Sequence, residues 1–170
     1  DDYEIRGGGI IRESLKDEQQ HMRQQVIQRN QKWAGGTIGR EQRWERYNQK
    51  AALILITGKR NVGKKALARA IEQRLFTDGK MVYFLGIANI LYGVDADIKK
   101  PGMDETHRPE HVRRLAEVSN ILLDAGVILI ITAISLKQKE LEIIQNIVDS
   151  DLIEPIWLGD EPTDINFSMK

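Results

Sequence analysis

The sequence contains no cysteine among its 170 residues. Disulfide bonds and thiolate-ligated metal centres are therefore excluded, and the absence fits a reducing compartment. No apolar run reaches the roughly 18 residues that a transmembrane helix needs, and no secretory signal opens the chain. We therefore expect a cytoplasmic protein without a membrane partner.

The sequence also lacks an excess of either charge. Lys and Arg number 25, Asp and Glu number 25, and the formal net charge at pH 7 is 0. Without a global positive potential, there is no electrostatic reason to expect nucleic acid or an anionic membrane surface as a partner. Any basic patch must be local.

The length suits one domain of ordinary size with an extension, able to bury about 70% of its unfolded surface. Because the chain begins with Asp1 rather than Met, we expect a piece of a longer protein. Residues 1–12 are typical of the closing strand of a preceding domain, since a lone terminal strand is not stable. Residues 12–32 predict a polar linker helix, which either rests on the domain or binds a partner helix. We assign residues 1–32 to this extension.

The main domain is assigned to residues 33–170, and its strongest pattern lies near its start. An apolar run at 51–57 leads into a glycine-containing loop at 58–65 and then into a helical pattern at 66–75. The two glycines are five positions apart and lysine follows the second, as in the strand, loop and helix of P-loop nucleotide-binding proteins.

The chemistry of the loop favours anion binding. Gly58 and Gly63 let backbone amides turn toward phosphate oxygens, and Lys64 can reach the outer phosphates. Lys65 departs from the motif, because Ser or Thr at this position would hold Mg²⁺. We therefore expect ATP or another nucleotide as ligand and regard Mg²⁺ as doubtful; the alternative is that the loop cations are ordinary solvated charges. The predicted phosphate-binding residues are Gly58, Lys59, Arg60, Asn61, Val62, Gly63, Lys64 and Lys65.

Strand and helix patterns alternate through the rest of the domain. Strands are predicted at 81–85, 127–133 and 153–157, with helices at 109–126 and 137–148. Continuous apolar strands between helices are typical of a parallel sheet covered on both faces. Pro155 cannot donate a ladder hydrogen bond and so marks the last strand as an edge. The predicted fold class is α/β, a P-loop NTPase-like parallel sheet with helices on both faces.

Three connecting segments bear on the site. A glycine-broken loop at 33–44 enters a short helix, and we expect its tryptophans to pack against the core rather than to stack on a ligand. Residues 86–93 predict a loop and helical turn at the sheet edge where parallel α/β proteins bind ligands. Residues 95–103 predict a mobile polar loop.

Several blocks, taken in order, resemble adenylylsulfate kinases, the P-loop enzymes that transfer the γ-phosphate of ATP to the 3′-hydroxyl of adenylylsulfate. The resemblance spans roughly residues 33–153 and agrees with the P-loop motif at 58–65. The blocks that carry it are Trp33 with Thr37, Ile38, Arg40 and Glu41; the loop 58–65; the strand 82–85; Arg108 with Arg113, Arg114 and Glu117; 124–126; and 132–135.

The resemblance implies ligands and partners as well as a fold. Residues that match the family's adenylylsulfate site are Asn89, Arg108, Arg113 and Ser135, and Arg114 is also available to a ligand's sulfate or phosphate. The first dozen residues are similar to the end of the GTP-binding subunit of sulfate adenylyltransferase, which some bacteria fuse ahead of the kinase. Sulfate adenylyltransferase subunits are therefore the expected partners, in sulfate assimilation, with a homodimer as a further option.

Departures from the family fall where its chemistry would occur. The family's Asp-Gly-Asp-Asn is 86–89 here, Gly-Ile-Ala-Asn, so both carboxylates that could organise magnesium, water or the attacking hydroxyl are missing. Leu91 replaces an arginine, Tyr92 a histidine and His111 an asparagine. The basic lid that follows the last strand in the family is expected to have no counterpart after Trp157.

Three groups of residues leave alternatives open. His107 and His111 are four positions apart and could form a metal pair, but a solvated helix face is favoured because no third ligand is evident. Asp95 and Asp97 could be a displaced catalytic pair, but loop residues that hydrogen-bond their own backbone are favoured. Apolar side chains that replace polar substrate contacts either fill the old site or form a surface for another protein; they are Ile87, Ile90, Leu91 and Tyr92.

The sequence therefore predicts an adenylylsulfate kinase-like domain with little or no kinase activity, in a regulatory or architectural role. No residue is assigned to catalysis and none to a metal. One alternative is an active kinase with relocated metal ligands, for instance Asp95 or Asp97. A second is a module that binds no nucleotide and only protein partners.

Overall fold

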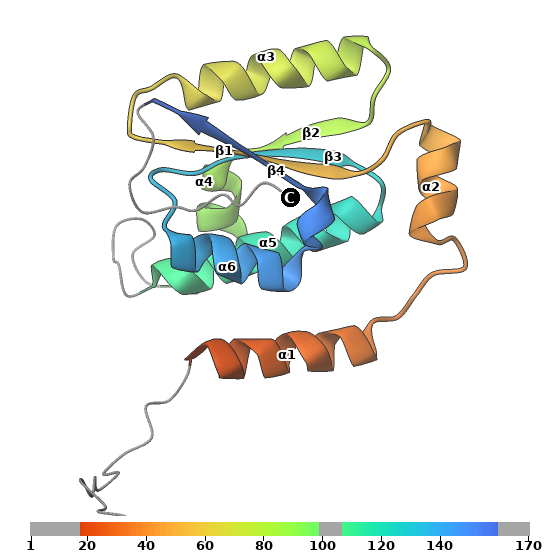
Figure 1. Ribbon diagram of the computed structural model, residues 1–170, viewed down its shortest axis with the longest axis vertical. Coiled ribbons are helices and arrows are strands. Elements are labelled where there is room, and N and C mark those ends of the chain that lie inside the picture. The colour runs from red at the N-terminus through yellow and green to blue at the C-terminus, as the bar shows by residue number, and fades with distance from the viewer. Residues whose placement is uncertain (1–17, 99–106, 160–170) are drawn as a thin grey trace, which may run out of the picture. The chain divides into compact units, whose positions relative to one another are not determined.

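The computed structural model describes residues 18–98 and 107–159, which fall into two compact units that divide between Trp33 and Ala34 (Figure 1). The first unit contains α1 (Glu18–Lys32), a polar helix as predicted, with the Arg29 guanidinium 5.7 Å from the centre of the Trp33 ring. The strand predicted at 1–12 and most of the polar loop predicted at 95–103 lie outside the described residues.

The second unit alternates helices and strands. In chain order its elements are α2 (Arg40–Tyr47), β1 (Ala52–Gly58), α3 (Lys64–Thr77), β2 (Val82–Leu85), α4 (Ile87–Asn89), the π-helical turn η1 (Ile90–Val94), α5 (Arg108–Asp124), β3 (Ile128–Thr132), α6 (Gln138–Ile147), the 3-10 turn η2 (Ser150–Leu152) and β4 (Ile153–Leu158). Among the described residues, no helix is long and apolar enough to cross a membrane.

The four strands form one parallel sheet in the order β2-β3-β1-β4. The predicted parallel sheet is confirmed, and so is the edge position of the last strand. Pro155 of β4 lies beside Leu55 of β1. Proline is tolerated there because an edge strand has a neighbour on one side only, so its missing N–H interrupts no second ladder.

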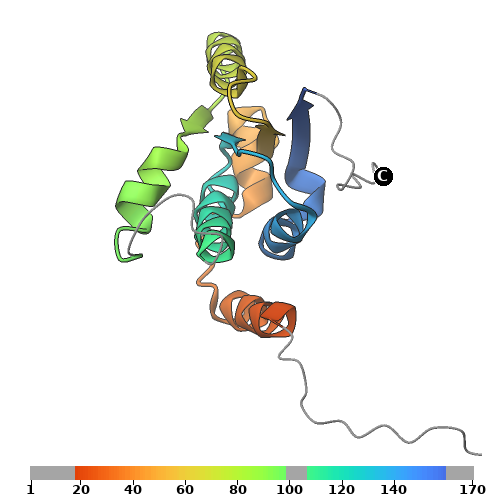
Figure 2. The ribbon, with the colours of Figure 1, turned by 90° about the vertical axis from the view of Figure 1, so that its left-hand side faces the viewer.

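Helices cover both faces of this sheet (Figures 1 and 2). On one face α3 packs against an apolar cluster centred on Ile56, Ala68 and Ile130. On the other face lie α5 and α6, and because side chains alternate along a strand, Leu55 and Leu129 point toward these helices and are buried. The sequence prediction of a sheet covered on both faces is therefore confirmed.

Polar side chains secure the ends and the free edge of the sheet. Gln49 is buried, and its amide donates to the carbonyls of Met81 and Gly126 at 3.0 and 2.8 Å while accepting from the Met81 amide at 2.7 Å. These bonds hold the segments entering β2 and β3 together. At the exposed edge of β2, the Phe84 amide donates to the Glu72 carboxylate at 2.8 Å, so this edge donor is not left without a partner.

The first glycine of the loop is required by the approach of β4. Gly58 has φ of +143°, and a Cβ built on it would lie 2.2 Å from the carbonyl oxygen of Leu158. A side chain there meets both an unfavourable backbone conformation and a backbone atom that cannot rotate away. Gly58 therefore closes the sheet as well as shaping the loop.

We expect Gly58→Ala to destabilise the domain by about 3 kcal/mol, from backbone strain together with overpacking against β4. Gly79→Ala is the matched control, because Gly79 has φ of +75° but nothing within 4 Å of its Cβ position. That control should cost only about 1 kcal/mol from the left-handed conformation. Urea unfolding of both variants measures the difference, and equal losses would show that the Leu158 contact is unimportant.

Candidate functional site

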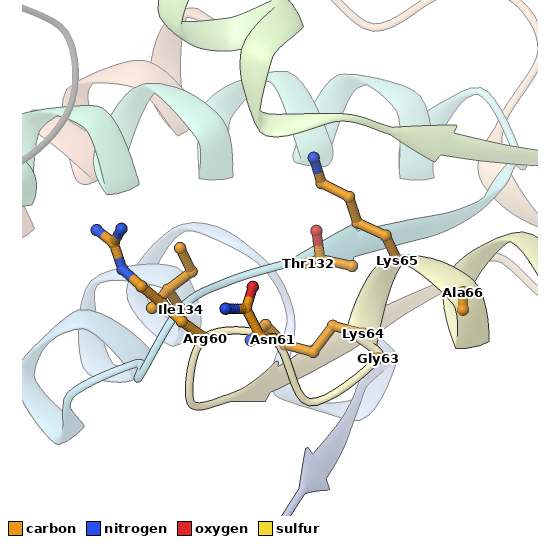
Figure 3. Close-up of a pocket in the computed structure, with 8 residues that line it drawn as sticks. All are labelled: Arg60, Asn61, Gly63, Lys64, Lys65, Ala66, Thr132 and Ile134. Carbon is orange, nitrogen blue, oxygen red and sulfur yellow. The ribbon is translucent and has the colours of Figure 1, made fainter.

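A cavity of about 510 Å³ opens at the carboxyl ends of β1 and β3 (Figure 3). This is the edge at which parallel α/β proteins bind ligands, and the volume is in the range of small-molecule sites. Its lining comprises Arg60, Asn61, Gly63, Lys64, Lys65, Ala66, Thr132 and Ile134. The predicted loop therefore faces a cavity, and sequence reasoning missed the Ile134 contribution because it comes from the segment after β3.

The backbone of the loop has the shape of an anion site. Gly63 caps α3 with φ of +87°, and Asn61 also has a positive φ of 61°. The helix begins at Lys64, so its first amides have no intrahelical partners and its positive end faces the cavity region. Such a turn into a helix amino terminus is suited to phosphate, sulfate or carboxylate.

Lys64 is folded into the loop. The side chain is buried, and its ammonium donates to the carbonyl of Gly58 at 2.9 Å and also to the carbonyl of Lys59. Burial lowers the pKa of the Lys64 ammonium from its ordinary value. A bound phosphate would offer this ammonium a charged acceptor in place of two neutral carbonyls.

Lys65 behaves differently from its neighbour. Figure 3 shows its side chain extending from the first turn of α3 past Thr132, and the residue is exposed. Within residues 18–98 and 107–159, its ammonium has no hydrogen-bond or ion-pair partner in the structure. The cavity thus carries one buried, engaged lysine and one lysine open to an incoming anion.

The lining of this cavity does not fit a magnesium ion. Mg²⁺ requires near-octahedral oxygen ligands, usually with one or two carboxylates. No carboxylate of residues 18–98 and 107–159 lines the cavity, and Lys65 occupies the position at which the motif has a hydroxyl. Among the described residues, no group of three or more His, Cys, Asp and Glu side chains could hold a metal.

Asp95 and His111 are hydrogen-bonded to each other. Asp95 is fully buried, and its Oδ2 lies 2.5 Å from Nδ1 of His111. The prediction that Asp95 bonds its own backbone in a loop is wrong, because its side chain pairs with His111; the prediction that His111 lies on a solvated face is also wrong, because its side chain is only 11% exposed and faces Asp95. Neither side chain lines the cavity.

Asp97 binds the first turns of α5. Both of its carboxylate oxygens accept from the Arg114 guanidinium, which also donates to the carbonyl of Val94 at 3.0 Å. The Arg114 hydrogen bond is the main cause of the lowered pKa of Asp97, and a bond to its own backbone contributes, as predicted from the sequence. Asp97 is therefore committed to holding η1 against α5.

Arg108 fastens α5 to the segment after β3. It donates to both oxygens of the buried Glu140, one of them at 3.0 Å, and to the carbonyls of Ile134 and Ser135 at 2.8 and 3.3 Å. Ser135 has φ of 42°, and its amide donates to the Gly58 carbonyl at 2.9 Å. Arg108 therefore holds in place the segment after β3 that contributes Ile134 to the cavity lining.

Arg113 is also paired with carboxylates. It donates to both oxygens of Glu110, at 2.7 and 2.8 Å, and lies 3.9 Å from Glu117. The hydrogen bond from Arg113, aided by Arg114, lowers the pKa of Glu110 to about 2. Each of the three arginines expected to meet a ligand is thus bound to a carboxylate in this conformation, and their contact with adenylylsulfate stays a prediction.

The apolar replacements after β2 divide between core and surface. Ile90 is 1% exposed and belongs to the core, whereas Tyr92 is 76% exposed. The core alternative therefore applies to Ile90, and a surface for another protein at Tyr92 stays a prediction. Asn89 is exposed in α4, its amide donating to the Gly86 carbonyl at 2.9 Å, and it is not part of the cavity lining.

Comparison with known proteins gives consistent matches. Residues 50–158 match the family described as adenylylsulphate kinase. An adenylyl-sulfate kinase of Aeromonas salmonicida is 34% identical over 119 residues, which are 70% of this chain and 59% of that protein. The bifunctional enzyme NodQ of a Rhizobium species is 32% identical over 129 residues, which are 76% of this chain and 18% of that enzyme.

A solved structure is similar over the same part of the chain. The Mycobacterium tuberculosis APS kinase CysC in complex with AMPPNP and APS is 25% identical, with a TM-score of 0.56, covering 64% of this chain and 62% of that one. The chain thus spans less than two thirds of the length of each of these relatives.

The Glu110 pair predicts a pH dependence of stability. Its folded pKa of about 2 lies below the ordinary 4.5, so the stabilisation is complete above pH 4.5 and is lost as the pH falls toward 2. The side chain is 38% exposed, so solvent screens the pair and the effect should be about 1 kcal/mol or less. Urea midpoints between pH 5 and 2.5 should fall less steeply in Glu110→Gln than in the parent chain; equal slopes would refute the pairing.

The Arg108 pair predicts a larger effect of substitution. Glu140→Gln removes a charge that is 4% exposed and that accepts two hydrogen bonds from the Arg108 guanidinium, so we expect a loss of about 2 kcal/mol. Glu154→Gln, the same change at an exposed position on β4, should cost below about 0.5 kcal/mol. Unfolding in urea at pH 7 compares the two, and a loss at Glu140 no larger than the control would show that the pair contributes nothing.

Proposed function

The chain belongs to the adenylylsulphate kinase family, and from this premise we propose that it is an adenylylsulfate kinase-like domain with little or no kinase activity. It binds a nucleotide, adenylylsulfate or phosphate in the loop cavity, and its role in sulfate activation is regulatory or architectural. A ligand-sensing domain of this kind reports the level of a product or holds an assembly together.

Ligand binding is supported by the loop and its two lysines. Gly63 and the start of α3 provide amides, Lys64 provides a buried ammonium, and Lys65 provides a second, exposed ammonium at the same cavity. The related APS kinase CysC has been solved with AMPPNP and APS, so a nucleotide and adenylylsulfate are the first ligands to test.

Weak catalysis is supported by one observation above the others: the residues that line the cavity, within the described part of the chain, include two lysines and no carboxylate. Phosphoryl transfer in P-loop enzymes depends on a metal ion that neutralises charge spread over several phosphate oxygens. Lys65 supplies a fixed single charge that cannot coordinate several oxygens as the transition state forms, so a loss of several kcal/mol of barrier reduction is expected.

The partner is proposed from the bifunctional relative. This chain matches only 18% of NodQ, so most of that enzyme lies outside the similarity. We propose that this domain likewise works beside a second activity, namely the sulfate adenylyltransferase subunits suggested by residues 1–12. A cytoplasmic location follows from that partnership and is part of the same proposal.

We expect a coupled assay with ATP, adenylylsulfate and Mg²⁺ to give a turnover at least about 10³-fold below that of the Aeromonas relative, corresponding to about 4 kcal/mol. Calorimetric titration should nevertheless show ligand binding that Lys64→Ala abolishes. Lys139→Ala, which removes an exposed lysine of α6, is the control and should bind as the parent does.

Two results would overturn this proposal in different ways. A turnover comparable with the relative's and lost in Lys64→Ala would identify an active kinase with ligands recruited from elsewhere, Asp97 being the exposed candidate. No heat with ATP, ADP, adenylylsulfate or phosphate would identify a module that binds only protein partners.

A further inference from the structure

We propose that the loop cavity selects polyphosphate ligands that carry no magnesium, and that Mg²⁺ weakens their binding because the Lys65 ammonium stands in the place of the metal. The ligand class is a free nucleoside di- or triphosphate or inorganic pyrophosphate. This inference rests on the proposed binding function and concerns the form of the ligand.

The first argument is the position of Lys65. It directly follows the loop lysine in the first turn of α3, where the motif places the hydroxyl that holds the metal against the outer phosphates. Its side chain extends past Thr132 at the carboxyl end of β3, and its ammonium has no partner among the described residues (Figure 3). The Lys65 ammonium, a permanent cation, therefore stands where the motif has the hydroxyl that holds a dissociable metal ion.

The second argument is the charge balance of the lining. Arg60, Lys64 and Lys65 line the cavity. Among the described residues of its lining, the side-chain acceptors are the neutral oxygens of Asn61 and Thr132. Magnesium cancels two of a nucleotide's negative charges and brings a divalent cation close to these groups. Attraction to the ligand falls and repulsion from the metal is added, so the metal-free ligand is preferred.

The third argument is the division of work between the lysines. Lys64 is buried, and its ammonium already donates hydrogen bonds to the carbonyls of Gly58 and Lys59. Lys65 is exposed and can move onto a phosphate without giving up a bond to the described residues. The metal-free preference should therefore depend on Lys65 more than on the other exposed lysine of the loop, Lys59.

The test is calorimetric titration of the full chain with ATP, ADP and pyrophosphate, in EDTA and in saturating MgCl₂ at equal ionic strength. We expect dissociation constants about tenfold lower in EDTA for the parent chain. Lys65→Thr, which restores a hydroxyl, should lose about tenfold in EDTA and should no longer be weakened by Mg²⁺. Lys139→Met is the control, since it removes an exposed lysine of α6 that does not line the cavity.

The outcomes separate this inference from the function on which it rests. Binding that is unchanged or strengthened by Mg²⁺, or equal losses in Lys65→Thr and Lys139→Met, would overturn the metal-free selection and leave ligand binding standing. No heat in either buffer with any of the three probes would overturn the binding function itself. Weakening by Mg²⁺ that disappears only in Lys65→Thr would establish the inference.

Discussion

The carbonyl of Gly58 is the point through which the loop, the sheet and the cavity wall are joined. Its oxygen accepts the Lys64 ammonium and the Ser135 amide, each at 2.9 Å. The Cα of Gly58 lies so close to β4 that any side chain there would clash with the Leu158 carbonyl. One residue thus fixes where β1 ends, how the lysine folds back and where the segment after β3 runs. The anion site follows from the packing of the sheet, because the same contacts that close the sheet set the loop.

Charge compensation separates the two groups of cations near the sheet edge. On α5, each arginine of the first two turns is matched by a carboxylate: Arg108 by Glu140, Arg113 by Glu110, and Arg114 by Asp97. At the loop, Lys64 and Lys65 line the cavity, and no carboxylate stands beside them among the described residues of the lining. An incoming anion gains most where protein carboxylates do not compete for the cations. The loop, rather than α5, is therefore the stronger anion site in this conformation.

The fold could be predicted from the sequence because strands, edge positions and glycine loops leave their signals within short stretches of residues. Continuous apolar runs gave the strands, Pro155 gave the edge, and the glycine spacing gave the loop. The pairs that determine the surroundings of the site are separated by long stretches of sequence: 16 residues between Asp95 and His111, and 32 between Arg108 and Glu140. The local sequence around one partner does not identify the other, because such pairs depend on how the helices pack against the ends of the strands. Sequence reasoning therefore assigned Asp95 to a loop bonded to its own backbone, His111 to a solvated helix face and Arg108 to a ligand.

The departures from the family are physically dependent on one another. A site that has lost the carboxylates of the 86–89 segment holds a metal poorly, and a fixed ammonium at Lys65 then supplies positive charge that the metal no longer brings. If carboxylates were restored at 86–89 while Lys65 remained, the Lys65 ammonium would repel the metal ion. If a hydroxyl replaced Lys65 without those carboxylates, the hydroxyl alone would bind the metal ion weakly. Under the proposed function, restoring one position alone would therefore not recover phosphoryl transfer. Lys65 and the 86–89 segment together would then leave a site suited to binding rather than to chemistry.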